Sequence, residues 1–148
     1  MTARFRPEDI KRMMGHLRTM AAPFGIAFAD RPFLSNSRMA LLAAEFAREE
    51  GRFQKFHDAV FAAYFSHGLD IGDMQVLLQI ASDIGMDSDA MEAAIKSGKH
   101  LPLLEAAMED SLRFGVTGVP TFIINEKSSI VGAQSLDAFR KMFVKGET

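Results

Sequence analysis

Residues 115–125 have the sequence Gly-Val-Thr-Gly-Val-Pro-Thr-Phe-Ile-Ile-Asn, and this stretch decides the fold. Two glycines come before Pro120, and the proline introduces a run of aromatic and β-branched residues. Such residues favour strands, and proline is tolerated at the first position of a strand or on an edge. The pattern predicts a strand from Thr121 to Asn125 that is entered through a specialised loop.

Downstream of this strand the sequence predicts a hairpin and a closing helix. Residues 126–128 are polar and suit a turn, and residues 129–131 form a second short apolar run. Two short strand-forming runs joined by such a turn indicate a β-hairpin. Ser135 is then an N-cap candidate for a final amphipathic helix over residues 136–143.

Upstream, the first 114 residues have helical periodicity, and six helices are expected. Pro7 suits the first turn of the first helix, where its missing N–H costs nothing. One face of that helix is predicted to consist of Ile10, Met13, Leu17 and Met20. Residues 26–30 form a brief extended piece, and the last of the six helices ends at Gly115.

Polar residues mark the starts of the helices in between. Asn36 or Ser37 can cap the second helix, Asp73 the fourth and Ser88 the fifth, because short oxygen-bearing side chains accept hydrogen bonds from a helix's first N–H groups. Residues 68–73 also place acidic residues three apart, like a piece of a calcium loop. The remaining ligands and the closing glutamate are missing, so capping by Asp73 is the favoured interpretation.

Composition excludes several classes of function. The 148 residues suggest a single domain over 1–148, and the net charge of -2 offers no footprint for nucleic acid. No apolar run approaches the ~20 residues of a membrane span, and the N-terminus lacks the apolar core of a secretory signal. A soluble cytoplasmic protein is expected, without nucleic-acid or membrane partners.

Cysteine is absent, and the histidines form no recognisable site. With no cysteine in 148 residues, disulfides, thiolate metal sites and a cysteine nucleophile are all excluded within this chain. The four histidines, at positions 16, 57, 67 and 100, have no metal-ligand spacing. No metal site is therefore expected.

A helix, Gly-Val-Pro, a hairpin and a helix in that order resemble the second half of a thioredoxin-type fold. The long helical segment before it resembles the helical insertion of the DsbA family. The sequence MALLAAEFAREEGRFQKFHDAVFAAYFSHGLDIGDMQVLLQIASDIGMD (residues 39–87) and the ending GVTGVPTFIIN…SSIVGAQSLDAFRKMF are most similar to its FrnE-like branch of thiol–disulfide oxidoreductases. The resemblance implies an α/β, thioredoxin-like class with a helical insertion over about 7–114 and a thioredoxin half over about 115–145.

The resemblance also implies a ligand site at the loop before the first strand. Val119-Pro120 resembles the cis-proline loop of the family, which turns the Val119 main chain outward toward an extended peptide or glutathione. Gly118 would leave space beside that main chain, and Thr121 completes the expected substrate-binding set. Proline at this position has a plainer explanation too, as a turn that the fold itself requires.

The chain departs from the family pattern at its start. The complete fold begins with a strand, a turn carrying Cys-X-X-Cys, a helix and a second strand, and none of these precedes Arg4. Thiol–disulfide exchange needs a thiolate. The expectation is that this chain lacks the catalytic segment, has no catalytic residue of its own and is silent in thiol exchange.

Two other functions remain open. The sister branch of 2-hydroxychromene-2-carboxylate isomerases and kappa-class glutathione transferases uses glutathione and a serine instead of a cysteine pair. In these glutathione-using relatives the start of the final helix binds the ligand, which makes Gln134 and Ser135 candidate glutathione contacts. Helix capping by Ser135 is the plainer explanation of that serine. No other cofactor is expected.

The other alternative is a non-catalytic binding module that dimerises. Without a neighbouring strand, the strand from Thr121 to Asn125 would expose backbone donors and acceptors along an apolar edge. A homodimer or a domain-swapped pair through this edge is expected. A second possibility is that residues 26–30 fold back and cover it within one chain.

Overall fold

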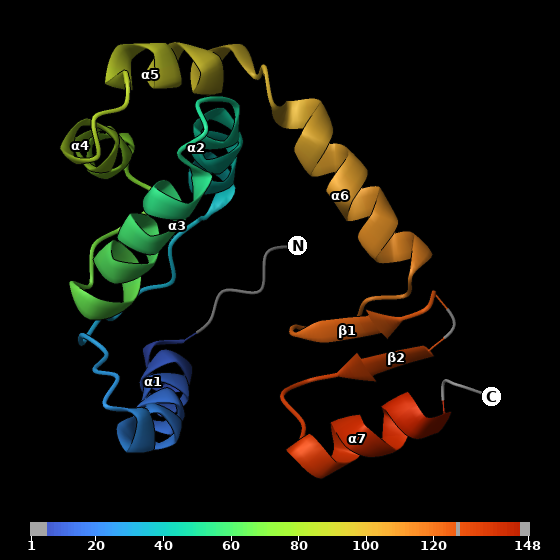
Figure 1. Cartoon of the computed structure of the whole chain (residues 1–148). Coiled ribbons are helices and arrows are strands. Elements are labelled where there is room, and N and C mark those ends of the chain that lie inside the picture. Colours follow the sequence, from blue (N-terminus) through green and yellow to red (C-terminus); the bar gives the residue numbers. More distant parts are fainter. Residues whose placement is uncertain (1–5, 127, 146–148) are drawn as a thin grey trace. The chain divides into compact units, whose positions relative to one another are not determined.

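A computed structural model gives the structure of the chain and describes residues 6–126 and 128–145 (Figure 1). The chain divides into two compact units, Met1–Leu101 and Pro102–Thr148. The helix expected as the last of the helical segment thus groups with the hairpin, apart from its first residue. That residues 1–148 form a single domain stays a prediction.

Every regular element in the described part of the first unit is a helix. Its elements are α1 (Pro7–Ala21), the 3-10 helix η1 (Ala22–Phe24), α2 (Arg38–Glu49), α3 (Phe53–Phe61), the π-helical turn η2 (Ala62–Ser66), α4 (Met74–Asp83) and α5 (Ser88–Ser97). The π-helical turn continues α3 and closes with the His67 N–H donating to the Ala62 carbonyl at 3.0 Å.

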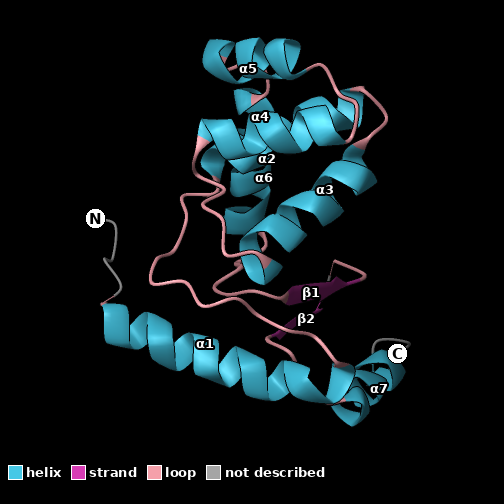
Figure 2. Ribbon diagram, turned by 90° about the vertical axis from the view of Figure 1, so that its left-hand side faces the viewer, coloured by secondary structure: helices cyan, strands magenta, loops and turns pink. Residues whose placement is uncertain are grey.

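The core of the first unit lies where α2 packs against α3, α4 and α5 (Figure 2). Phe56 of α3, Leu77 of α4 and Met91 of α5 are the largest fully buried side chains. Ala43 and Ala47 of α2 have no exposed surface at all. These small side chains let the neighbouring helices approach α2 closely and interlock large side chains around it.

Helix α1 buries a different face from the one predicted. Ile10 is buried as expected, but the stripe continues through Met14 and Ala21. Met13 and Met20 are 36% and 51% exposed. An α-helix has 3.6 residues per turn. Positions 10, 14 and 21 therefore lie closer to a single line along the helix surface than positions 10, 13 and 20 do. The first helix is therefore correctly located but wrongly oriented in the prediction.

The caps of the helices follow the local sequence with one correction. Asp73 accepts a hydrogen bond from the Gln75 N–H at 2.8 Å, as predicted. The fifth helix begins at Ser88, but its cap is Asp87, which accepts from the Ala90 N–H at 2.9 Å. At the start of α2, the Asn36 side chain accepts from the Arg38 N–H. Aspartate at position 87 reaches that N–H because it is the last residue with extended backbone.

Residues 26–30 form no strand. The segment is extended, and the Ala29 N–H donates to the Phe65 carbonyl at 2.8 Å, so that it follows the end of η2. The Phe28 and Phe65 rings meet edge to face with centroids 5.5 Å apart. Arg18 of α1 holds the segment as well, because its side chain donates to the Phe28 carbonyl and pairs with Asp30.

The second unit contains α6 (Leu101–Arg113), β1 (Thr121–Ile124), β2 (Ser128–Val131) and α7 (Leu136–Lys145). The two strands are antiparallel and pair Thr121 with Val131. The buried apolar residues of the hairpin are Ile124 and Ile130. The Phe122 ring of β1 meets the Phe139 ring of α7 edge to face at 4.8 Å, which attaches the closing helix to the hairpin.

The hairpin differs from the prediction by one residue at each strand. Asn125 and Glu126 have positive φ values of 51° and 56° and lie in the turn, so β1 ends at Ile124. Asparagine tolerates this left-handed conformation because its short side chain can bond locally. Lys127 lies outside the described residues, as does the side chain of Phe143, which was predicted to line α7.

Candidate functional site

The candidate site is the loop that joins α6 to β1. α6 ends at Arg113, and Gly115 in the turn that follows has a φ of 63°, a left-handed conformation that glycine adopts without strain. The loop then reaches Val119, and the Val119–Pro120 peptide bond is cis. The Val119 side chain is 90% exposed, the largest exposure among the described large apolar residues.

Two hydrogen bonds hold the loop on either side of Val119. The Thr121 hydroxyl donates to the Gly118 carbonyl at 2.6 Å. The Gly132 N–H, at the end of β2, donates to the Pro120 carbonyl at 2.7 Å. Gly132 has a φ of 83°, which turns the chain sharply after the strand. The loop is thus fastened to the hairpin, although its sequence contains two glycines.

The main chain of Val119 is left between these anchors. Among the hydrogen bonds of the described residues, none uses the Val119 N–H or C=O. Main-chain donors and acceptors are obligatory hydrogen-bonding groups, so these two are satisfied by water or by a ligand. An extended peptide can pair with such groups at the edge of a sheet.

Gly118 is not required by its protein neighbours, and the space that it would leave for a ligand stays a prediction. A Cβ atom at this position would meet the Val131 Cγ1 atom at 3.6 Å, which is ordinary van der Waals contact. Its backbone also lies outside the left-handed region. Neither packing nor backbone conformation within the second unit therefore requires glycine here.

Gln134 and Ser135 both make local contacts. The Gln134 side-chain amide donates to the Val131 carbonyl at 3.0 Å. The Ser135 hydroxyl accepts from the Ala138 N–H at 3.3 Å and caps α7, as the sequence predicted. The structure places Gln134 next to β2, whose residue Val131 pairs with Thr121. It shows no hydrogen bond from either side chain to the loop.

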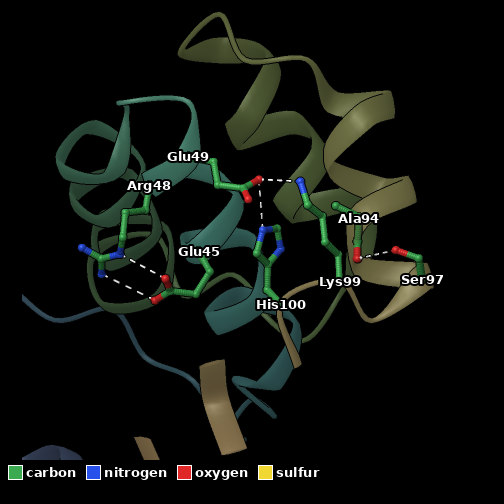
Figure 3. Close-up of polar contacts among 7 residues, drawn as sticks. All are labelled: Glu45, Arg48, Glu49, Ala94, Ser97, Lys99 and His100. Atoms are coloured by element: carbon green, nitrogen blue, oxygen red, sulfur yellow. Dashed lines mark hydrogen bonds and ion pairs between the residues drawn. The ribbon is translucent and has the colours of Figure 1, made fainter. Parts of the chain in front are cut away.

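The first unit holds a separate cluster of titratable groups at the end of α2. The Glu49 carboxylate pairs with the Lys99 ammonium at 2.7 Å and lies 3.1 Å from His100 Nε2 (Figure 3). His100 is almost fully buried, and neither ring nitrogen makes a hydrogen bond of good geometry.

The same contacts shift the titration of Glu49. The hydrogen bond from the Lys99 ammonium, and after it the close approach of the His100 ring, lower the pKa of the Glu49 carboxyl below its usual value of 4.5. The side chain is 46% exposed, so solvent screens these interactions. The cluster ties the C-terminal end of α2 to the residues after α5 and is far in sequence from residues 115–125.

Metal ligation has little support in the described part of the chain. No group of three or more histidine, aspartate or glutamate side chains gathers there in a way that could hold an ion. Asp70 accepts from the Gly72 N–H at 2.8 Å, and Asp73 caps α4. Both carboxylates of the calcium-like stretch are therefore engaged by the turn and the helix start. Across the same residues no helix is both long and apolar enough to span a bilayer.

Comparison with known proteins supports the family resemblance. An uncharacterized protein, YwbO, of Bacillus subtilis (strain 168) is 29% identical over 104 residues, which are 70% of this chain and 52% of that protein. The chain thus spans about half the length of this curated relative.

Two solved structures share the fold. A probable DsbA oxidoreductase from Streptomyces coelicolor superposes with a TM-score of 0.75 at 22% identity, covering 95% of this chain and 61% of the other. A 2-hydroxychromene-2-carboxylate isomerase superposes with a TM-score of 0.73 at 18% identity, covering 97% of this chain and 71% of the other.

The family model described as DSBA-like thioredoxin domain matches residues 1–144, nearly the whole chain. The predicted order of helices, Gly-Val-Pro loop, hairpin and final helix is also the order that the structure shows. The chain belongs to the DsbA-like thioredoxin family.

Proposed function

We propose that residues 115–125 form the substrate-docking loop of a DsbA-like thiol–disulfide oxidoreductase of the FrnE-like branch. The ligand would be an extended peptide or glutathione, paired with the Val119 main chain. Val119 carries the proposal. It is highly exposed, and its main chain makes no hydrogen bond among the described residues.

The docking geometry follows from the two anchors. Because Thr121 and Gly132 fasten the loop at 2.6 Å and 2.7 Å, little conformational freedom would be lost when a peptide pairs with it. Main-chain pairing would supply affinity independent of the peptide's sequence. Such tolerance suits an oxidoreductase that acts on many unfolded chains.

The chemistry itself needs a group that these residues do not have. Exchange proceeds by attack of a thiolate on a disulfide sulfur, with the second sulfur leaving as a thiolate. The 148 residues contain no cysteine. The proposed role of this polypeptide is therefore to dock and orient the substrate, with the attacking thiol supplied from outside residues 1–148. By itself the chain should give no turnover above background in an insulin-reduction assay.

The docking role is tested by NMR titration with a disulfide-containing, unstructured peptide and with oxidised glutathione. We expect amide shifts confined to Gly118, Val119, Thr121 and their neighbours. A Val119→Pro variant removes the N–H donor and should weaken binding, whereas Val119→Ala keeps the main chain and should bind normally. Equal binding by both variants would show that the Val119 N–H is not the docking group.

Glutathione chemistry of the isomerase type is a second candidate. Two observations favour it: the chain has no cysteine, and a 2-hydroxychromene-2-carboxylate isomerase shares its fold. Under this proposal reduced glutathione would contact the Val119 main chain and the start of α7 at Gln134 and Ser135. Titration with reduced glutathione should then move the Val119 and Ser135 amides together. Movement at Val119 alone would favour peptide docking.

We also propose that β1 pairs with its counterpart in a second copy. β1 is bonded to β2 on one side, and no other strand among the described residues joins the sheet. Phe122 and Ile123 are 41% and 40% exposed, so the strand is apolar as well as open to a partner.

Light scattering after size exclusion tests this assembly. A dimer at micromolar concentration is expected, and Ile123→Lys should dissociate it by placing a charge on the strand. Leu136→Lys on α7, which is 64% exposed, is the matched control and should remain dimeric. A monomeric wild-type chain would remove the proposal.

A further inference from the structure

A cavity of about 500 Å³ lies in the first unit where α3 and the π-helical turn η2 meet α4. Its lining includes Ala62 and Ala63 of η2 and Val76 and Ile80 of α4. Ala63 and Ile80 are 4% and 8% exposed, so they belong to the core. The cavity therefore has an apolar floor on helices, and its volume suits a small organic molecule.

The π-helical turn contributes to the edge of this cavity. Such turns are rare, and single ones are found often at functional sites. The Leu69 N–H donates to the Ala63 carbonyl at 2.9 Å, and Leu69, which is 44% exposed, also lines the cavity. Because Ala62 and Ala63 end at Cβ, they leave room in the cavity that a longer side chain would take.

One carboxylate stands at the rim. Asp83, the last residue of α4, is exposed and lines the cavity beside Gln79. The Gln79 side-chain amide donates to Asp83 Oδ1 at 2.7 Å, and Asp83 Oδ2 makes no hydrogen bond among the described residues. A carboxylate accepts several hydrogen bonds. Asp83 can therefore still receive a donor from a ligand, and its exposure makes it reachable from solvent.

The charge of the lining favours a cation. Lysine and arginine are absent from the described residues that line the cavity. Arg52 is outside the lining, where its guanidinium donates to the Ile84 carbonyl at 2.9 Å. His67 does line the cavity, and imidazole groups are ordinarily neutral above about pH 7. In that pH range the Asp83 carboxylate gives the cavity a negative charge, which attracts a cationic ligand and repels an anionic one.

We propose that this cavity binds a small organic cation, an amine with an apolar body. The apolar body would pack against Ala63 and Ile80, and the ammonium group would pair with the Asp83 carboxylate at the rim. Exposed ion pairs are weak, so the apolar contacts would supply most of the affinity and Asp83 the preference for a cation. The site lies within the first unit and is independent of the docking loop around Val119.

Calorimetric titration with phenylethylamine, phenylethanol and phenylacetate tests the proposal. The three share a phenyl ring and differ in charge, and at about pH 8 an alkylamine is protonated while imidazole groups are neutral. We expect saturable binding of phenylethylamine with a dissociation constant of roughly 1 mM or below. The alcohol should bind about threefold more weakly, and the anion more weakly still. Amide shifts in NMR spectra should centre on Ala63 and Ile80.

A first pair of variants tests the cavity itself. Ala62→Leu places a larger side chain at a half-buried position of the lining and should weaken binding at least about tenfold, because the ligand and the leucine compete for the same space. Ala90→Leu on α5 makes the same change at an exposed position outside the lining and should bind like the wild type.

A second pair tests the charge. Asp83→Asn should weaken the binding of phenylethylamine about threefold and leave that of phenylethanol unchanged. Asp58→Asn is the matched control, because the Gln54 amide donates to Asp58 at 2.8 Å in the same arrangement, four residues apart, outside the cavity lining. This control should bind all three compounds like the wild type.

Three results would overturn the proposal. The first is no saturable binding of phenylethylamine by the wild-type chain. The second is equal affinity for it in the wild type and Ala62→Leu, and the third is equal affinity in the wild type and Asp83→Asn. Should Ala62→Leu fail to fold, Asp83→Asn decides alone, because an exposed side chain at the end of α4 can be replaced without disturbing the core.

Discussion

Thr121 illustrates how one side chain can position a loop. Its hydroxyl donates to the Gly118 carbonyl, three residues earlier, and so spans Val119 and Pro120. The family resemblance implied a substrate-binding role for Thr121, as part of the loop around Pro120, and did not imply this hydrogen bond. The hydrogen bond that gives the side chain its role depends on how the loop folds back.

Replacing Thr121 with valine keeps the shape of the side chain and removes this hydrogen bond. We expect the free energy of unfolding to fall by about 0.5–1.5 kcal/mol, the usual net value of one hydrogen bond. Thr117→Val is the matched control, because Thr117 is exposed in the same loop. Urea unfolding of both variants measures the difference, and equal midpoints would contradict the structural role of Thr121.

Glu49 gives the molecule a pH-dependent contact. Its lowered pKa means that the folded state keeps the carboxylate charged to lower pH than the unfolded state does. The contribution to stability is therefore complete above the unfolded value of 4.5 and is lost as the pH falls through the lowered pKa.

A Glu49→Gln variant should show the corresponding change in pH dependence. Its melting temperature should decline less steeply than that of the wild type as the pH is lowered from 5 toward 3, a span of about two units around the unfolded pKa. The adjacent Glu50→Gln serves as the control and should follow the wild type. Parallel curves for wild type and Glu49→Gln would rule out the contribution.

Among the elements, the helices were easiest to place and hardest to orient. Pro7, Asp73 and Ser135 each mark a helix start by a local interaction, and the structure confirms all three starts. The predicted face of α1 was wrong because positions 13 and 20 also carry apolar methionines at helical spacing, next to the set that is buried. Which face is buried depends on the elements that pack against the helix, and the periodicity of the helix does not identify those elements.

The corrected cap of α5 makes a direct prediction. Asp87→Ala should lower the free energy of unfolding by about 1 kcal/mol, because the Ala90 N–H loses its acceptor. Ser88→Ala should change it by only a few tenths, since alanine is a better helix former and no cap is lost. Thermal unfolding compares the two. A larger loss in Ser88→Ala would restore the original assignment.

At the scale of the whole molecule, the chain consists of a helical unit and a hairpin-containing unit. The core of the helical unit depends on three large side chains from three helices, Phe56, Leu77 and Met91. None of them is unusual in its local sequence. Their importance comes from their meeting against the small residues of α2.

Phe56→Ala should therefore be costly. We expect a loss of about 3–5 kcal/mol in the free energy of unfolding, from lost burial and from the cavity left behind. Phe61→Ala on the same helix is the matched control, because Phe61 is 51% exposed, and its loss should be clearly smaller. Similar losses from both would place the core elsewhere than around Phe56.

The sequence by itself determined the order of the helices, most of their caps, the hairpin and the loop at residues 115–121. These features arise from interactions between residues within a few positions of each other, such as a capping side chain and the N–H group that it accepts from. They also arise from the conformational freedom of single glycines. The tertiary structure alone decided which face of α1 is buried and that Arg31 is enclosed. Arg31 meets Met14 from 17 positions away and Tyr64 from still farther along the chain. No local pattern encodes a contact of that kind, because it exists only once separate elements pack together.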